Sequence, residues 1–185
     1  QRSGVSAMQD VDLSTIKLLL VDDEAHCTKL MEAFLRQAGF SRITMTNDSR
    51  QALELFQQVE PDLVALDMRM PHMDGAQFLK VVKQEWPDVV RILLTGYADI
   101  GSTIEAINQG EIYRYITKPW TDEDMALTVR QALERKALER EKERLEALAL
   151  EQNEALRQLN ESLEAKVQER TADLQKANER VKQSF

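Results

Sequence analysis

Residues 16–24 read IKLLLVDDE, an apolar run that ends in three consecutive acidic residues. Four more short apolar runs follow, and stretches of helical length separate them: RITM (42–45), DLVALD (62–67), RILLT (91–95) and IYRYIT (112–117). Nearly continuous apolar runs that alternate with helices are typical of a parallel sheet with both faces covered. The sequence therefore predicts an α/β fold, with a doubly wound sheet of five parallel strands.

Polar side chains stand at the carboxyl ends of four of these expected strands. They are Asp22, Asp23 and Glu24 after the first strand, Asp67 at the end of the third, Thr95 at the end of the fourth and Lys118 after the fifth. Ligands of open α/β sheets bind at this edge. Clustered carboxylates repel one another unless a cation lies among them, and Mg²⁺ fits a few carboxylates plus a phosphate oxygen. The pattern predicts a phosphoryl-transfer site with a carboxylate nucleophile.

Each of these residues taken singly has an ordinary structural explanation. An aspartate at a strand end often caps the helix that follows, and an isolated Lys-Pro pair is uninformative. The joint occurrence, with one element after each appropriate strand, favours the functional interpretation.

Four motifs strongly resemble the receiver domain of two-component response regulators, the CheY-like fold. They are VDDE (21–24), LDMRMPHMDG (66–75), LLTGYAD (93–99) and YITKPW (115–120). The resemblance covers residues 16 to about 135 and implies the flavodoxin-like strand order 2-1-3-4-5. It also implies a phosphorelay protein that a histidine kinase or a phosphotransfer protein phosphorylates.

The resemblance assigns roles to the residues of the acidic edge. It implies that Asp67 is the phosphoacceptor and that Lys118 contacts the phosphoryl group. It further implies that Mg²⁺ is held by Asp22, Asp23, Asp67 and the backbone carbonyl of Arg69.

The same resemblance predicts the switch. After transfer, Thr95 is expected to bond the phosphoryl group, and Tyr115 matches the aromatic residue that turns inward on activation. Arg69 and Tyr97 occupy positions that set how long the phosphoryl group lasts. Both are bulky, and our hypothesis is that they partly screen attacking water; the alternative is that both side chains point into solvent.

The last third of the chain has a different composition. All six Gly and all four Pro precede residue 120, so residues 121–185 are expected to form one long helix. Apolar residues recur there, and with Gln152 and Arg170 counted as positions of the same stripe the spacings are a heptad-like three and four. The apolar residues are Leu145, Ala149, Leu156, Leu159, Leu163, Val167, Leu174, Ala177 and Val181. Two successive spacings of four, from Leu159 to Val167, form a stutter.

This stripe predicts a parallel two-stranded coiled coil and hence a homodimer. Gln152 and Arg170 are polar residues within the stripe. They leave open the alternative of a single solvated helix that is stabilised by its charge pairs.

We expect three parts: a disordered arm or cloning remnant (1–13), a receiver domain (14–135), and a coiled-coil signalling helix (136–185) continuous with the last receiver helix. We expect no output enzyme within the chain.

The GYAD and KPW motifs resemble receivers coupled to HD-GYP cyclic-di-GMP phosphodiesterases; diguanylate cyclases, phosphatases and hybrid kinases are the alternatives.

Two other functions compete with that of a phosphorylated receiver. One is a dimerisation scaffold that works without phosphorylation, and the other is a haloacid dehalogenase-type phosphatase. The phosphatase would have D-x-D at the nucleophile, and this chain lacks it at Asp67.

Charge and composition exclude other classes. The net charge is −8, and residues 135–185 carry eleven basic and eleven acidic residues. Without a basic cluster we expect no nucleic-acid binding, and without an apolar run of about 20 residues we expect no membrane span. The single Cys27 cannot form an internal disulfide, which favours the cytoplasm.

Overall fold

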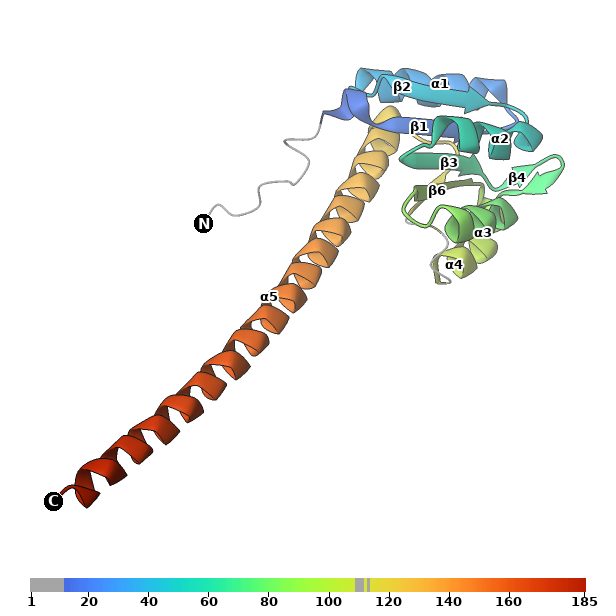
Figure 1. Cartoon of the computed structure of the whole chain (residues 1–185). Helices are drawn as coiled ribbons and strands as arrows, with labels where there is room; N and C mark the ends of the chain where they lie inside the picture. Colours follow the sequence, from blue (N-terminus) through green and yellow to red (C-terminus); the bar gives the residue numbers. More distant parts are fainter. Residues whose placement is uncertain (1–11, 109–111, 113) are drawn as a thin grey trace. The chain divides into compact units, whose positions relative to one another are not determined.

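The structure is a computed structural model that describes residues 12–108, 112 and 114–185, and it leaves undescribed the side chains of Ala76, Tyr97, Ile100, Ser102 and Ala106. Most of the expected arm, residues 1–11, lies outside the described residues. The chain divides into two compact units, residues 1–138 and residues 139–185. The first unit holds all the strands (Figure 1).

Five parallel strands form the sheet of the first unit in the order β2-β1-β3-β6-β7 (Figure 1). Their bounds are Lys17–Val21 (β1), Arg42–Thr46 (β2), Leu63–Asp67 (β3), Val90–Thr95 (β6) and Arg114–Thr117 (β7). Numbered among themselves, these strands follow the predicted order 2-1-3-4-5, which is confirmed. The sequence analysis missed a separate antiparallel ribbon of β4 (Arg69–Met70) and β5 (Met73–Asp74).

Helices connect the strands. Their bounds are Ala25–Gln37 (α1), Ser49–Val59 (α2), Gly75–Glu85 (α3), Ile100–Asn108 (α4) and Asp122–Gln183 (α5), and 3-10 turns lie at Leu13–Thr15 (η1) and Tyr97–Asp99 (η2). Two apolar clusters show how the sheet is covered. One cluster joins the strands to α1 and the beginning of α5, and the other joins them to α2 and α3.

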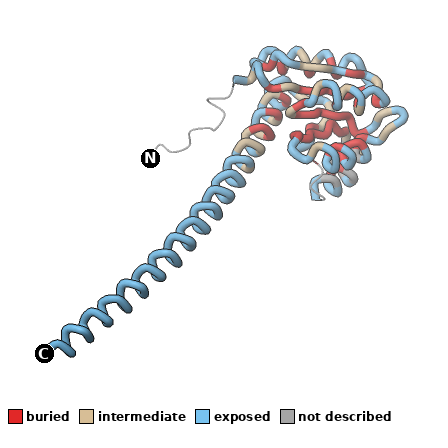
Figure 2. Tube along the Cα trace, viewed as in Figure 1, coloured by how far each residue is buried: buried red, intermediate tan, exposed pale blue. Residues whose placement is uncertain are grey.

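The strand β1 illustrates why its sequence is apolar throughout. Leu18 and Leu20 belong to the cluster beneath α1 and α5, whereas Leu19 and Val21 belong to the cluster beneath α2 and α3. All four side chains are fully buried, and Figure 2 shows that the buried residues concentrate on the strands. Because alternate side chains of a strand point to opposite faces, a sheet covered on both faces needs apolar residues at every position.

The long helix α5 begins where the sequence predicts. The hydroxyl of Thr121 accepts a hydrogen bond from the backbone N–H of Asp124 at 3.2 Å, and three acidic residues stand in the first turn. Such a cap and such charges stabilise a helix N-terminus. Within the second unit, every residue from 141 onward is exposed (Figure 2). Among the described residues, no helix has the length and apolar character that a membrane span requires.

Candidate functional site

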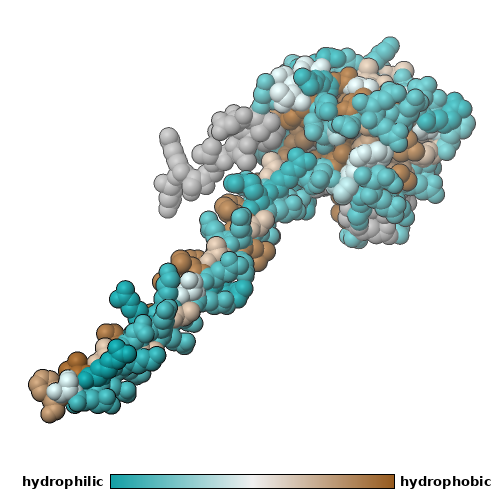
Figure 3. Space-filling model, in the orientation of Figure 1, coloured by the Kyte–Doolittle hydropathy of each residue, from teal (hydrophilic) through white to brown (hydrophobic). Residues whose placement is uncertain are grey.

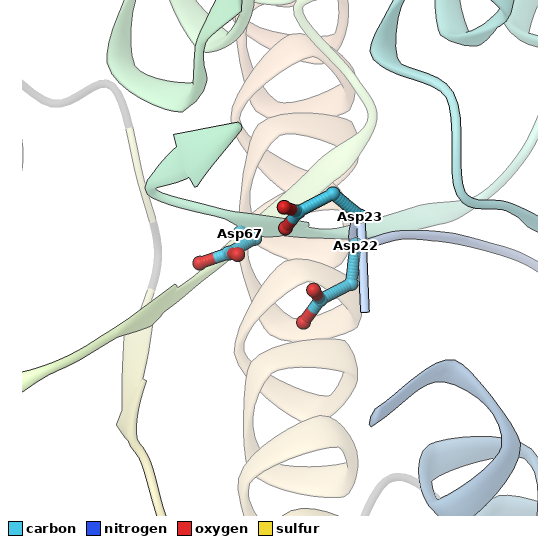
Figure 4. Close-up of side chains that lie close together, drawn as sticks. All are labelled: Asp22, Asp23 and Asp67. Atoms are coloured by element: carbon cyan, nitrogen blue, oxygen red, sulfur yellow. The ribbon is translucent and has the colours of Figure 1, made fainter. Parts of the chain in front are cut away.

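Three carboxylates meet at the carboxyl ends of β1 and β3 (Figure 4). Asp22 and Asp23 follow β1, and Asp67 is the last residue of β3. One carboxylate oxygen from each lies within 4.8 Å of the other two. Asp22 and Asp67 are buried, whereas Asp23 is exposed. The neighbouring pairing of β1 with β3 brings the two buried carboxylates together, as the sequence analysis expected.

Lys118 follows β7 and reaches the same carboxylates. Its Nζ lies 2.8 Å from Oδ2 of Asp22 and 3.3 Å from Oδ2 of Asp67. Its backbone N–H donates to the carbonyl oxygen of Thr95 at 2.8 Å, which fixes the lysine beside the end of β6. The acceptor predicted from the sequence therefore has a cation in direct contact with it.

The charges of the site are unbalanced. Burial, and then the charge of Asp22, raise the pKa of Asp67 to about 7, although Lys118 opposes the rise. Burial alone would lower the pKa of Lys118, but its hydrogen bond to Asp22 and the two carboxylate charges raise it overall. The site thus holds one ammonium and three carboxylates, and the ammonium contacts two of them. This oxygen-rich, electron-rich donor set fits a hard divalent cation such as Mg²⁺.

Hydrogen bonds hold Asp22 in place. Its Oδ1 accepts from the backbone N–H of Glu24 at 2.9 Å. The side-chain amide of Asn47 donates to the carbonyl oxygen of Asp22 at 2.8 Å and to the hydroxyl of Thr28 at 3.1 Å. Asn47 therefore ties the end of β1 to α1.

The two expected switch residues lie on neighbouring strands. Thr95 ends β6 and is fully buried, and its hydroxyl oxygen lies 3.1 Å from that of Thr103 on α4. Tyr115 lies on β7 with 44% of its surface exposed. Thr95 is thus engaged with α4, and the aromatic residue faces outward.

The side chain of Arg69 pairs with Asp99. It is 74% exposed, and its Nε donates to Oδ1 of Asp99 at 2.5 Å. This ion pair connects the ribbon after β3 with the turn after β6. The side chain of Tyr97, the other residue expected to govern phosphoryl lifetime, lies outside the described residues.

Gly75 is packed against the backbone of Asp67 and Met68. A Cβ at this position would lie 2.4 Å from the carbonyl oxygen of Asp67 and 3.0 Å from Cα of Met68. We expect Gly75→Ala to lower the free energy of unfolding by about 1–3 kcal/mol, because backbone atoms cannot move aside as a flexible side chain can. Gly101→Ala is the matched control, since a Cβ there would meet nothing within 4 Å. Urea unfolding should show Gly101→Ala neutral or stabilised; equal losses would contradict the prediction.

Comparison with known proteins identifies the family. The family model described as the response regulator receiver domain matches residues 18–130. The chain belongs to this family. Its first unit is a receiver domain of a two-component system, and the resemblance seen in the sequence is confirmed.

Individual relatives agree with this family assignment. The hydrogenase transcriptional regulatory protein HoxA of Cupriavidus necator is 37% identical over 76% of this chain, but this chain spans only 29% of HoxA. The regulatory protein AtoC of Escherichia coli is 33% identical over 68% of this chain and 27% of its own length. A receiver domain of an HD domain-containing protein from Pseudomonas fluorescens is 39% identical, with a TM-score of 0.63 over 69% of this chain and 93% of that one.

Sequence reasoning missed three residues around the site: Asn47, Asp99 and Thr103. Asp99 belongs to the LLTGYAD motif, so the sequence could have predicted that it lies near the site. The sequence could not have predicted its ion pair with Arg69. Asn47 and Thr103 stand outside the motifs that were singled out. Only the fold brings Asn47 to Asp22 and Thr103 to Thr95.

Proposed function

We propose that Asp67 accepts a phosphoryl group from the phosphohistidine of a histidine kinase or phosphotransfer protein, in the cytoplasm. The observation that carries the proposal is the buried Asp67 carboxylate in contact with Lys118 and beside the acid pair Asp22 and Asp23. Transfer forms a bond between a carboxylate oxygen and phosphorus while the bond from phosphorus to the donor imidazole nitrogen breaks.

Residues of this chain prepare that transfer. Asp22, Asp23, Asp67 and the backbone carbonyl of Arg69 would hold Mg²⁺, which neutralises charge on the phosphoryl oxygens when it is bound. The ammonium of Lys118 supplies a further positive charge where the phosphoryl oxygens arrive. After the transfer, the hydroxyl of Thr95 turns toward the phosphoryl group. The side chain of Tyr115 then moves inward, into the space that the Thr95 side chain has left.

Intact-protein mass spectrometry tests the proposal. Incubation with acetyl phosphate and Mg²⁺ is expected to add the mass of one phosphoryl group, and a chelator is expected to prevent the addition. Borohydride reduction of the acyl phosphate should then mark Asp67 in peptide maps. No uptake, or a label on another residue, would overturn the proposal. A dimerisation scaffold predicts no uptake, and a phosphatase predicts continuous turnover of a phosphate ester.

We expect Arg69 to lengthen the life of the phosphoaspartate, because its guanidinium is held by Asp99 beside the site and restricts water. Arg69→Ala should speed the loss of the phosphoryl group about two- to fivefold, equivalent to about 0.5–1 kcal/mol of the barrier. Arg144→Ala is a matched control, because Arg144 forms an exposed ion pair with Glu141 in the second unit. Phosphoprotein decay followed by mass gives both rates. Tyr97→Ala should act in the same direction as Arg69→Ala, and unchanged decay in both would contradict the screening hypothesis.

We also propose that the helix of residues 139–185 pairs with the same helix of a second copy. Apolar side chains stay exposed along it: Leu145, Leu148, Leu156, Leu159, Leu163, Val167, Leu174 and Val181. Figure 3 shows brown patches along this helix. With Leu148 included, and with Gln152 and Arg170 counted as positions of the stripe, the stripe from Leu145 to Leu174 repeats spacings of three, four and four residues. An eleven-residue repeat departs little from a straight helix, so the stripe stays on one face and favours a partner along its whole length.

A second copy is the partner that this stripe fits best. Gln152 and Arg170 interrupt the stripe, and in a parallel, in-register pair each would meet its own equivalent. Paired glutamine amides can hydrogen-bond to each other across the seam, and such polar residues specify register. Charge pairs within the helix, such as Arg157 with Glu154 and Glu161, keep the remaining surface polar.

The output of the switch is proposed to be an HD-GYP cyclic-di-GMP phosphodiesterase. The GYAD and KPW motifs support this, as does the similarity to a receiver from an HD domain-containing protein. The alternative is a transcriptional output, as the name of HoxA states for that protein. Reading the gene beyond the codon for Phe185 and assaying the full-length product for cyclic-di-GMP hydrolysis distinguish the two.

A further inference from the structure

We propose that Thr103 is a positioning residue, whose hydroxyl holds Thr95 in its unphosphorylated arrangement and thereby sets how readily the phosphorylated state forms. The inference rests on the proposed function of Asp67 as acceptor. It adds a residue of α4 that stands outside the motifs of the acidic edge.

The two threonines form a small buried network. The Thr103 hydroxyl oxygen lies 2.9 Å from the carbonyl oxygen of Asp99 and 3.1 Å from the hydroxyl oxygen of Thr95, and its single proton is shared between these two acceptors. The Thr95 hydroxyl donates in turn to the carbonyl oxygen of Gly96 at 3.2 Å. Thr95 is 0% and Thr103 is 1% exposed, so water does not replace these bonds easily.

The backbone of Thr95 is fixed, so its side chain must make the change. Thr95 pairs with Thr117 in the sheet, and its carbonyl oxygen accepts from Lys118. The residue before it, Leu94, pairs with Asp67, which places Thr95 one position beyond the acceptor on the neighbouring strand. Rotation about the Cα–Cβ bond is therefore the motion that brings the hydroxyl toward a phosphoryl group.

That rotation breaks the contact with Thr103. A hydroxyl carries one proton, so Thr95 cannot donate to both Gly96 and a phosphoryl oxygen, and its oxygen moves away from Thr103 as it turns. Thr103 does not follow, because it is anchored to Asp99. The carboxylate of Asp99 is itself bound by Arg69. Loss of the Thr103 hydroxyl therefore destabilises the unphosphorylated arrangement selectively.

Calorimetric titration with beryllofluoride and Mg²⁺, where beryllofluoride stands in for the phosphoryl group on Asp67, measures the balance. Thr103→Val keeps the side-chain shape and removes the hydroxyl, and we expect a dissociation constant about three- to tenfold lower than that of the wild type. Thr103→Ser retains the hydroxyl and should match the wild type. An unchanged or weaker affinity of Thr103→Val would overturn the proposal.

A second background separates the hydrogen bond from packing. In Thr95→Val no hydroxyl can be released, so adding Thr103→Val should change the dissociation constant no further. An equal gain in both backgrounds would show that Thr103 acts through packing and would overturn the proposal.

A second measurement keeps this proposal separate from the proposed function. If the wild type binds no beryllofluoride in the presence of Mg²⁺, the acceptor function of Asp67 fails. The positioning role of Thr103 is then tested on the metal-free protein, by the three-bond NMR couplings of the Thr95 side chain. Thr103→Val, and not Thr103→Ser, must alter the rotamer populations of Thr95. Unaltered populations would overturn it.

Discussion

The Asp67→Asn variant is expected to take up no phosphoryl group and yet to be more stable than the wild type when Mg²⁺ is removed. A carboxamide is not a nucleophile for phosphorus under these conditions, so uptake from acetyl phosphate should vanish. The gain in stability has a separate cause. Burial and the charge of Asp22 raise the pKa of Asp67 to about 7, which means that the folded protein holds this carboxylate charged at a cost.

The sign of the pH dependence follows. The pKa of Asp67 is about 7 in the folded protein and about 3.8 as its ordinary value, so the folded state binds more protons between these limits. The contribution of Asp67 to stability is therefore fully present below about pH 4 and is lost as the pH rises through 7. At pH 8 the asparagine variant should be more stable by about 2–4 kcal/mol.

Thermal and urea unfolding with a chelator, from pH 5 to pH 8, measure this difference. The gap between Asp67→Asn and the wild type should widen with pH and narrow when Mg²⁺ is added. Asp173→Asn, in the exposed part of α5, controls for the exchange of an aspartate for an asparagine. A variant less stable than the wild type at pH 8 would contradict the prediction.

Two charges placed in the stripe of α5 are expected to convert a dimer into a monomer. Leu156→Glu with Leu163→Glu removes two apolar contacts from each chain and puts like charges opposite one another in a parallel pair. Burial of each leucine contributes about 1.5–3 kcal/mol. The two substitutions together therefore remove more free energy than a weakly stable helix dimer can lose. Light scattering should show the mass of two chains for the wild type and of one for the variant.

Leu150→Glu is the matched control, because Leu150 is 72% exposed but lies off the stripe. It should leave the mass of the dimer unchanged, and a wild type that is already monomeric would refute the proposed pairing.

Crosslinking decides the orientation of the pair. In a Cys27→Ser background, Gln152→Cys should form a disulfide with its own equivalent if the helices are parallel. An antiparallel pair centred on Leu163 would instead place residue 152 opposite residue 174. Crosslinking only when Gln152→Cys is combined with Leu174→Cys would therefore contradict the parallel arrangement.

The five strands of the sheet could be predicted because each contains a short apolar run, which burial on both faces makes nearly continuous in β1, β3 and β6. The ribbon of β4 and β5 could not, since strands of two residues are too short to show a period. The start of α5 could also be predicted, because Thr121 and the acids after it are local signals. The strand β7 begins at Arg114 rather than at the first apolar residue of IYRYIT, Ile112, and such boundaries are weakly specified by composition.

The sequence by itself determined the kind of site, because acids, a hydroxyl and a lysine at successive strand ends must meet at one edge of a parallel sheet. Only the tertiary structure decided which hydrogen bonds these side chains make. Lys118 forms an ion pair with Asp22, Arg69 forms one with Asp99, and Thr95 is hydrogen-bonded to Thr103. Hydrogen bonds depend on differences of less than an ångström between segments far apart in the chain, and the pattern of residue types contains no such distances.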